Sequence, residues 1–90
     1  MPDYSHIPEP YRSAYKACSR NKGVVGKSKM CGCFSCLNIY PSTDVVEWIE
    51  ENDGGFTAEC PKCGIDSVIP DASGIPLNAE FLATMKKWWF

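Results

Sequence analysis

The chain has 90 residues, the size of one small domain, and a folded protein's composition: 44% hydrophobic and 22% charged residues, with net charge −2. This composition excludes a disordered chain, and no apolar run is long enough to cross a bilayer. A core of this size is marginal unless a metal or disulfides stabilise it. The first residues lack the features of a signal peptide, so we expect a cytoplasmic location, where six cysteines favour metal binding over disulfides.

Charge is unevenly distributed along the chain. Residues 10–43 carry six Lys and Arg residues and no acid, whereas residues 44–90 carry nine acids against three lysines. Such asymmetry predicts either an acidic partner, nucleic acid included, or attraction between the two halves of the chain. The basic side chains considered for a partner surface are Arg12, Lys16, Arg20 and Lys22.

The N-terminal third is predicted to form an arm, a helix and a loop. Pro8 and Pro10 favour an extended arm over residues 1–9. Apolar residues at helical spacing follow, and they predict a helix over residues 10–22. Residues 23–29 combine glycines with lysines and are predicted to form a flexible basic loop.

The rest of the chain is predicted to alternate short strands with helices. In order, we expect a strand over residues 37–40, a helix over 43–51, strands over 56–59 and 65–69, and a helix over 79–89. Val45, Trp48 and Ile49 form the buried stripe of the middle helix. Asn78 is a typical N-cap for the last one.

Two Cys-x-x-Cys turns carry the chemistry of this sequence. The turn from Cys33 to Cys36 and the turn from Cys60 to Cys63 are separated by 23 residues, close to the spacing of four-cysteine zinc sites. Two intervening residues let a tight turn aim both sulfurs at one ion, and four thiolates complete the tetrahedral coordination of Zn²⁺. We therefore predict that these four cysteines bind Zn²⁺ and thereby stabilise the small core.

Other ligand sets stay open at this point. Cys31 offers a further sulfur two residues before Cys33 and is an alternative ligand. Cys18 lies on the apolar face of the first predicted helix, where a core position is expected. His6 is the one histidine of the sequence, and we expect solvation or a local hydrogen bond rather than ligation. Iron in place of zinc, or free thiols, are the remaining alternatives.

The order of these motifs resembles a family of small bacterial proteins. The segments that carry the resemblance are Cys31-Gly-Cys-Phe-Ser-Cys-Leu, Cys60-Pro-Lys-Cys-Gly-Ile-Asp-Ser-Val-Ile and the final Trp-Phe, within residues 30–90. The family is described only as cytoplasmic proteins of unknown function with two cysteine knuckles. The resemblance implies zinc and a cytoplasmic bacterial protein, and it implies nothing about a mechanism. A phage origin is the alternative, since small zinc-stapled proteins suit compact genomes.

Catalysis is not expected. Four thiolates leave no open position on a zinc ion, and the sequence lacks the His-x-Glu signature of zinc deaminases. Binding is expected instead. Trp88 and Trp89 point about 100° apart on a helix, so a small core does not bury both. We expect Trp89 with Phe90 to be partly exposed and to anchor another protein or a second copy of the chain.

The sequence as a whole predicts an α+β fold. We expect residues 10–90 to form one zinc-stapled domain with a zinc-ribbon-like core over residues 30–90, in which two Cys knuckles lie on short β-hairpins beside three helices. The predicted function is that of a non-catalytic, cytoplasmic adaptor or regulator that binds another protein and no membrane. The alternative is a nucleic-acid-binding module that uses the basic residues of segment 12–29.

Overall fold

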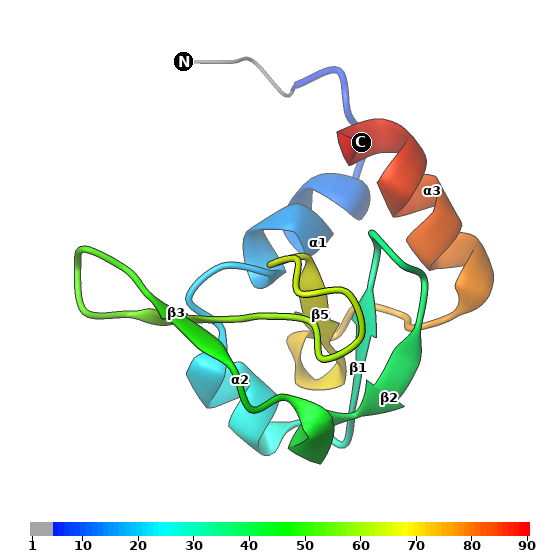
Figure 1. The fold of residues 1–90 in the computed structure, drawn as a ribbon. Helices are drawn as coiled ribbons and strands as arrows, with labels where there is room; N and C mark the ends of the chain where they lie inside the picture. Colours follow the sequence, from blue (N-terminus) through cyan, green and yellow to red (C-terminus); the bar gives the residue numbers. More distant parts are fainter. Residues whose placement is uncertain (1–4) are drawn as a thin grey trace.

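The structure is a computed structural model that describes residues 5–90 (Figure 1). Its elements are α1 (Tyr11–Ala17), α2 (Lys22–Lys27), β1 (Met30–Cys33), β2 (Ile39–Pro41), the 3₁₀ turn η1 (Ser42–Asp44), β3 (Trp48–Glu50), β4 (Phe56–Ala58), β5 (Val68–Pro70), the 3₁₀ turn η2 (Asp71–Ser73) and α3 (Ala79–Trp89). The mixed α+β class is confirmed for these residues. None of the helices described is long and apolar enough to cross a membrane.

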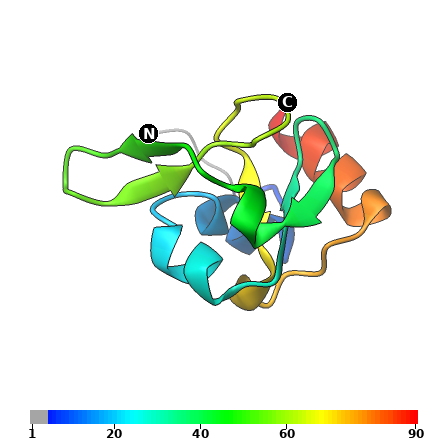
Figure 2. The same ribbon diagram turned by 60° about the horizontal axis from the view of Figure 1, so that its bottom comes forward.

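The strands form two separate antiparallel sheets. One sheet has the order β2-β1-β5, with Cys31 opposite Tyr40 on one side and opposite Pro70 on the other. The second sheet pairs β3 with β4, with Ile49 opposite Thr57. Figures 1 and 2 show the β3–β4 hairpin projecting from one side of the molecule, with α3 on the opposite side.

Strands β1 and β5 of the three-stranded sheet pack against a core on each face, whereas edge strand β2 leaves Ile39 and Pro41 exposed. The α2-side core consists of Val25, Cys31, Cys33, Tyr40, Val45, Ala58, Cys60 and Val68. The α3-side core consists of Ala14, Cys18, Phe34, Ile69, Phe81, Leu82 and Met85. Gly32 lets α3 approach β1 closely, because a Cβ at this position would lie 3.1 Å from Leu82 and 3.2 Å from Leu77.

The N-terminal prediction is partly wrong. The helix predicted over residues 10–22 ends at Ala17, and a second helix, α2, occupies most of the predicted loop 23–29. Arg20 has a φ of 50°, which turns the chain between the two helices. The buried Asn21 side chain fixes this turn, since it donates to Ala17 O and Val68 O and accepts from Ala58 N–H.

The arm predicted over residues 1–9 lies partly outside the described residues. Residues 5–9 turn rather than extend, and Ile7 is only 2% exposed. Burial of this apolar side chain explains why the segment folds back onto the domain.

The helix predicted over residues 43–51 is also wrong. Only the 3₁₀ turn η1 forms there, and Trp48 and Ile49 lie in strand β3. Strand β3 pairs with β4 across a turn that contains Gly54, whose φ is 88°. This strand pairing outweighs the helical spacing of the apolar residues. Strands β2, β4 and β5 and helix α3 lie where strands and a helix are predicted. The Asn78 side chain caps α3 by accepting from Phe81 N–H at 2.7 Å.

Candidate metal centre

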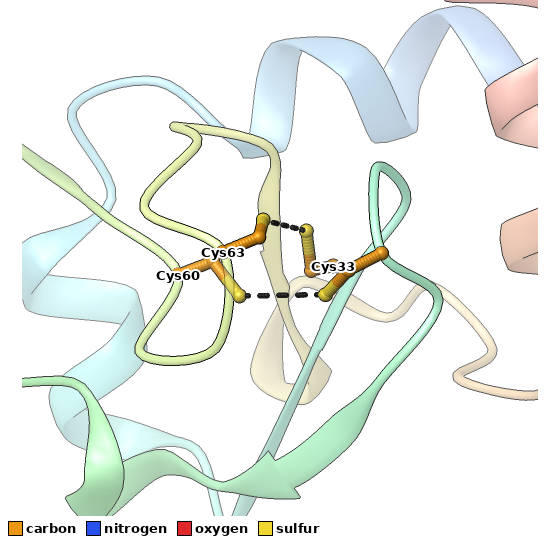
Figure 3. Close-up of side chains that lie close together, drawn as sticks. Cys33, Cys60 and Cys63 are labelled. Carbon is orange, nitrogen blue, oxygen red and sulfur yellow. Dashed lines mark hydrogen bonds between the residues drawn. The ribbon is translucent and has the colours of Figure 1, made fainter.

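Four cysteine sulfurs converge between the two knuckles. The Sγ atoms of Cys33, Cys36, Cys60 and Cys63 all lie within 4.8 Å of one another. Figure 3 shows that the two knuckles point their sulfurs toward each other, with Cys33 Sγ 3.7 Å from Cys63 Sγ and Cys36 Sγ 3.7 Å from Cys60 Sγ. In a regular tetrahedron with Zn–S bonds of about 2.3 Å, the sulfurs are about 3.8 Å apart. The observed spacing therefore fits the coordination shell of one metal ion.

Knuckle 1, residues 33–37, is a tight turn that closes the β1–β2 hairpin. The Cys33 N–H donates to Asn38 O at 3.0 Å, and the Leu37 N–H donates to Cys33 O at 2.9 Å. Leu37 has a φ of 65°, in the left-handed region. This backbone turns both cysteine side chains to the same side of the loop.

Knuckle 2, residues 60–64, repeats this backbone in a different place. The Cys60 N–H donates to Ile65 O at 2.9 Å, and the Gly64 N–H donates to Cys60 O at 2.9 Å. Gly64 has a φ of 79°, a conformation that glycine adopts without steric cost. Knuckle 2 does not lie on a hairpin, contrary to the prediction, because β4 pairs with β3 and β5 pairs with β1.

Each knuckle also aims a backbone N–H at its own first sulfur. Ser35 N–H donates to Cys33 Sγ, and Lys62 N–H donates to Cys60 Sγ, both at 3.3 Å. Hydrogen bonds of this kind are stronger when the acceptor is ionised. The two knuckles therefore favour thiolates, which are the form that binds metals.

Side chains from outside the Cys-x-x-Cys turns add further donors. The Ser67 hydroxyl lies 3.1 Å from Cys33 Sγ, and Asn38 Nδ2 donates to Cys36 Sγ at 3.3 Å. The buried Tyr40 hydroxyl makes no hydrogen bond of standard geometry, but it is close enough to Cys60 to stabilise the thiolate. None of these three residues is identified by the sequence patterns. Ser67 and Tyr40 are distant in sequence from the sulfurs that they approach and carry no spacing signal, and Asn38 lies just outside the Cys-x-x-Cys pattern.

The protein environment alone does not ionise all four thiols. Burial raises the pKa of Cys33 to about 12 and also raises the pKa of Cys63. Burial raises the pKa of Cys60 too, but the nearby Tyr40 hydroxyl and the hydrogen bond from the backbone N–H of Lys62 outweigh it and lower that pKa to about 7. A bound cation would favour the thiolate forms of Cys33 and Cys63, which burial opposes.

Cys31, the alternative ligand, is not a member of the cluster. Its side chain is fully buried in the α2-side core, where burial raises the pKa of the thiol to about 11. Cys31 and Cys33 face the same side of β1, but two residues of strand separate them by about 6–7 Å. Knuckle 2 meets only the Cys33 end of the strand.

Cys18 and His6 also lie outside the cluster. Cys18 is in the α3-side core, 7% exposed, and its Sγ donates to Tyr15 O at 2.8 Å. His6 lies beside Trp88, with 6.3 Å between the ring centroids. Neither side chain contributes to the four-cysteine cluster.

The basic side chains predicted for a partner surface interact with their own chain. Arg12 lies 3.5 Å from Glu9, and Arg20 lies 2.6 Å from Asp53. The Lys22 ammonium lies over the rings of Trp48 and Phe56, at 5.3 and 4.6 Å from their centroids. The pKa of the Glu9 carboxyl is lowered chiefly by a hydrogen bond from Ser13. Lys16 lies close enough to Glu9 to contribute to the same shift.

The aromatic end of α3 leaves Trp89 and Phe90 partly exposed and exposes Trp88 as well. Trp89 is half-buried and stacks on Tyr15 of α1, with 3.8 Å between the ring centroids. Trp88 is the more exposed tryptophan, at 40%, and Phe90 is 65% exposed. The helical rotation between successive residues turns Trp89 toward α1 and Trp88 toward solvent.

Comparison of the chain with protein-family models, with curated proteins and with solved structures gave no match. The resemblance of the knuckle motifs to small bacterial proteins therefore stays a prediction from the sequence.

Proposed function

We propose that the four clustered thiolates bind one Zn²⁺ ion and that this ion stabilises a non-catalytic domain that binds another protein. The observation that carries the metal assignment is the pair of matching knuckles with cross-knuckle sulfur separations of 3.7 Å. Four sulfur ligands at tetrahedral spacing suit zinc, and they also suit iron. Zinc is proposed because it needs no redox partner to serve as a structural ion.

A structural role follows from the ligand set. Four thiolates complete the coordination of zinc and leave no position for water or substrate, whereas catalytic zinc sites keep one open. Zinc binding also contributes on the order of 10 kcal/mol to the folding of small domains. The proposed ion would join the β1–β2 hairpin to the loop between β4 and β5, which belong to different sheets.

A protein partner is favoured over nucleic acid by the surroundings of the basic residues. Arg12 and Arg20 are paired with carboxylates, and Lys22 lies over two aromatic rings, so these charges are already engaged. Exposed aromatic side chains such as Trp88 and Phe90 are typical anchors of protein interfaces. We propose a cytoplasmic location for this interaction.

The metal assignment is tested by measuring zinc in the purified protein and following its unfolding with and without a strong chelator. We expect one zinc per chain, and loss of cooperative unfolding when the chelator removes it. A metal-free protein with the same melting transition would contradict the proposal. Affinity capture from the native cell, with and without nuclease, then separates a protein partner, which survives nuclease, from one held through nucleic acid.

A further inference from the structure

A cavity of about 320 Å³ lies beside knuckle 2, between α1 and the C-terminal end of α3. Ser67, whose hydroxyl contacts Cys33 Sγ, lines it, so the cavity adjoins the cysteine cluster. Its volume is within the range of cavities that bind small ligands or single side chains.

Aromatic rings make up much of the cavity lining. Tyr15 and Trp89, which stack on each other at 3.8 Å, and Phe34 and Phe90, whose ring centroids are 5.6 Å apart, all line it. Phe34 is only 2% exposed and is anchored in the α3-side core. Stacking covers one face of Tyr15 and one face of Trp89. A ring face that is open to the cavity carries negative electrostatic potential and attracts cations.

Two carboxylates complete the lining. Glu51 Oε1 accepts from the Thr57 hydroxyl at 2.8 Å, and Thr57 is itself fixed by Arg20 N–H at 2.9 Å. Burial raises the pKa of the Cys18 thiol, and the negative charge of the nearby Asp66 carboxylate adds to this shift. Within residues 5–90, neither Glu51 nor Asp66 forms an ion pair with a lysine or arginine.

We propose that this cavity binds the cationic side chain of a lysine or arginine presented by a protein partner. The aromatic faces and the two unneutralised carboxylates both favour a cation, and the same carboxylates repel phosphate groups. The inference rests on the proposed function of the domain as a protein-binding module and gives the chemistry of the residue that it recognises.

The test uses the zinc-loaded protein and NMR titration of its backbone amides and the Trp89 indole. The probes are short acetylated and amidated peptides with a central lysine, arginine or norleucine, together with free n-butylammonium chloride. We expect the lysine or arginine peptide to shift the resonances of cavity residues. The norleucine peptide keeps the four side-chain carbons of lysine but lacks the ammonium group, and we expect it to bind at least about tenfold more weakly.

Two substitutions test the carboxylates. Glu51→Gln with Asp66→Asn keeps the shape of both side chains, and we expect it to weaken binding of the cationic peptide about tenfold. Asp44→Asn removes an exposed acid outside the cavity and serves as the matched control, with unchanged affinity. Zinc content and circular dichroism verify that each variant is folded.

Each remaining outcome overturns the inference in an identifiable way. Equal binding of the norleucine peptide, or no shift with either cationic peptide, would show that the cavity does not recognise a cation. If free butylammonium binds as tightly as the peptides, the ligand of the cavity is a small amine rather than a side chain of a protein partner. Because zinc is measured separately, a zinc-loaded chain that ignores all probes contradicts only this inference, whereas a folded chain without zinc contradicts the proposed metal centre.

Discussion

The two knuckles share one backbone but have different surroundings. Knuckle 1 closes a hairpin and places Cys33 in a fully buried position, with Leu37 in the left-handed conformation. Knuckle 2 lies in the loop that links the two sheets. Its first cysteine, Cys60, is buried like Cys33, but its second, Cys63, is exposed where Cys36 is half-buried, and Gly64 holds the conformation of Leu37. The Cys-x-x-Cys turn is thus set by local hydrogen bonds, whereas the burial of its sulfurs is set by the fold.

This difference indicates unequal dependence on the metal. Strand pairing and core packing hold knuckle 1 in place, whereas residues 61–66 of the second loop are all exposed. We therefore expect the ion to order knuckle 2 more than knuckle 1.

The largest expected effect comes from exchanging one cysteine in each knuckle. Cys33→Ser removes a ligand and places a hydroxyl in the apolar α2-side core, so it should abolish both zinc binding and stable folding. Cys63→Ser removes a ligand at an exposed position and should weaken zinc binding while leaving more of the fold intact. Zinc content and urea unfolding of both variants measure the difference.

Cys31→Ser is the matched control for this pair. It changes an equally buried cysteine that is not in the cluster, so we expect full zinc content and a stability loss of about 1–2 kcal/mol. Loss of zinc from this variant, with zinc retained by Cys33→Ser, would show that the ligand set is wrong.

After metal removal, knuckle 2 is expected to lose its structure before knuckle 1. After addition of a chelator, the Gly64 amide, which donates to Cys60 O, should lose protection from hydrogen exchange before the equivalent Leu37 amide. Hydrogen exchange followed by NMR during chelation measures both. Simultaneous loss of protection would mean that the sheet does not hold knuckle 1 independently.

The side-chain donors should tune metal affinity. Tyr40→Phe and Ser67→Ala each remove a hydroxyl beside a sulfur, and each should weaken zinc binding about tenfold. Ser35→Ala is the control, because Ser35 contributes its backbone N–H rather than its hydroxyl. Competition titrations with a chelator give the zinc affinities. If Tyr40→Phe binds zinc as tightly as the unchanged protein, the Tyr40 hydroxyl does not stabilise the metal centre.

The smallest effect concerns the left-handed residue of each knuckle. Gly64→Leu should cost about 1–2 kcal/mol in the zinc-loaded protein, since a Cβ there meets no atom and only the backbone conformation is strained. Leu37→Gly relieves the same strain in knuckle 1 and should not destabilise it by more than about 1 kcal/mol. Equal losses of unfolding free energy in the two variants would contradict the equivalence of the knuckles.

The sequence predicts those parts that local chemistry determines. The spacing of the four cysteines, the Asn78 cap and the apolar face of α3 are all local patterns, and the corresponding structure is present. Residues 43–51 show the opposite case. Their apolar spacing suits a helix, but pairing of Trp48–Glu50 with Phe56–Ala58 decides in favour of a strand.

Two further features depend on contacts distant in sequence. Asn21 fixes the turn between α1 and α2 because its side-chain amide donates to Val68 O and accepts from Ala58 N–H, which no local pattern indicates. Tyr40 approaches Cys60 because β2 and the second knuckle meet across the α2-side core. Such positions follow from the assembled fold rather than from spacing along the chain.

The central claim is that one zinc ion is held by four thiolates, two from each knuckle. X-ray absorption at the zinc edge of the purified protein tests it most directly, together with the zinc-to-protein ratio. We expect one zinc per chain with four sulfur ligands at about 2.3 Å and no nitrogen or oxygen ligand. A chain without metal, or a zinc shell that contains nitrogen or oxygen, would contradict it.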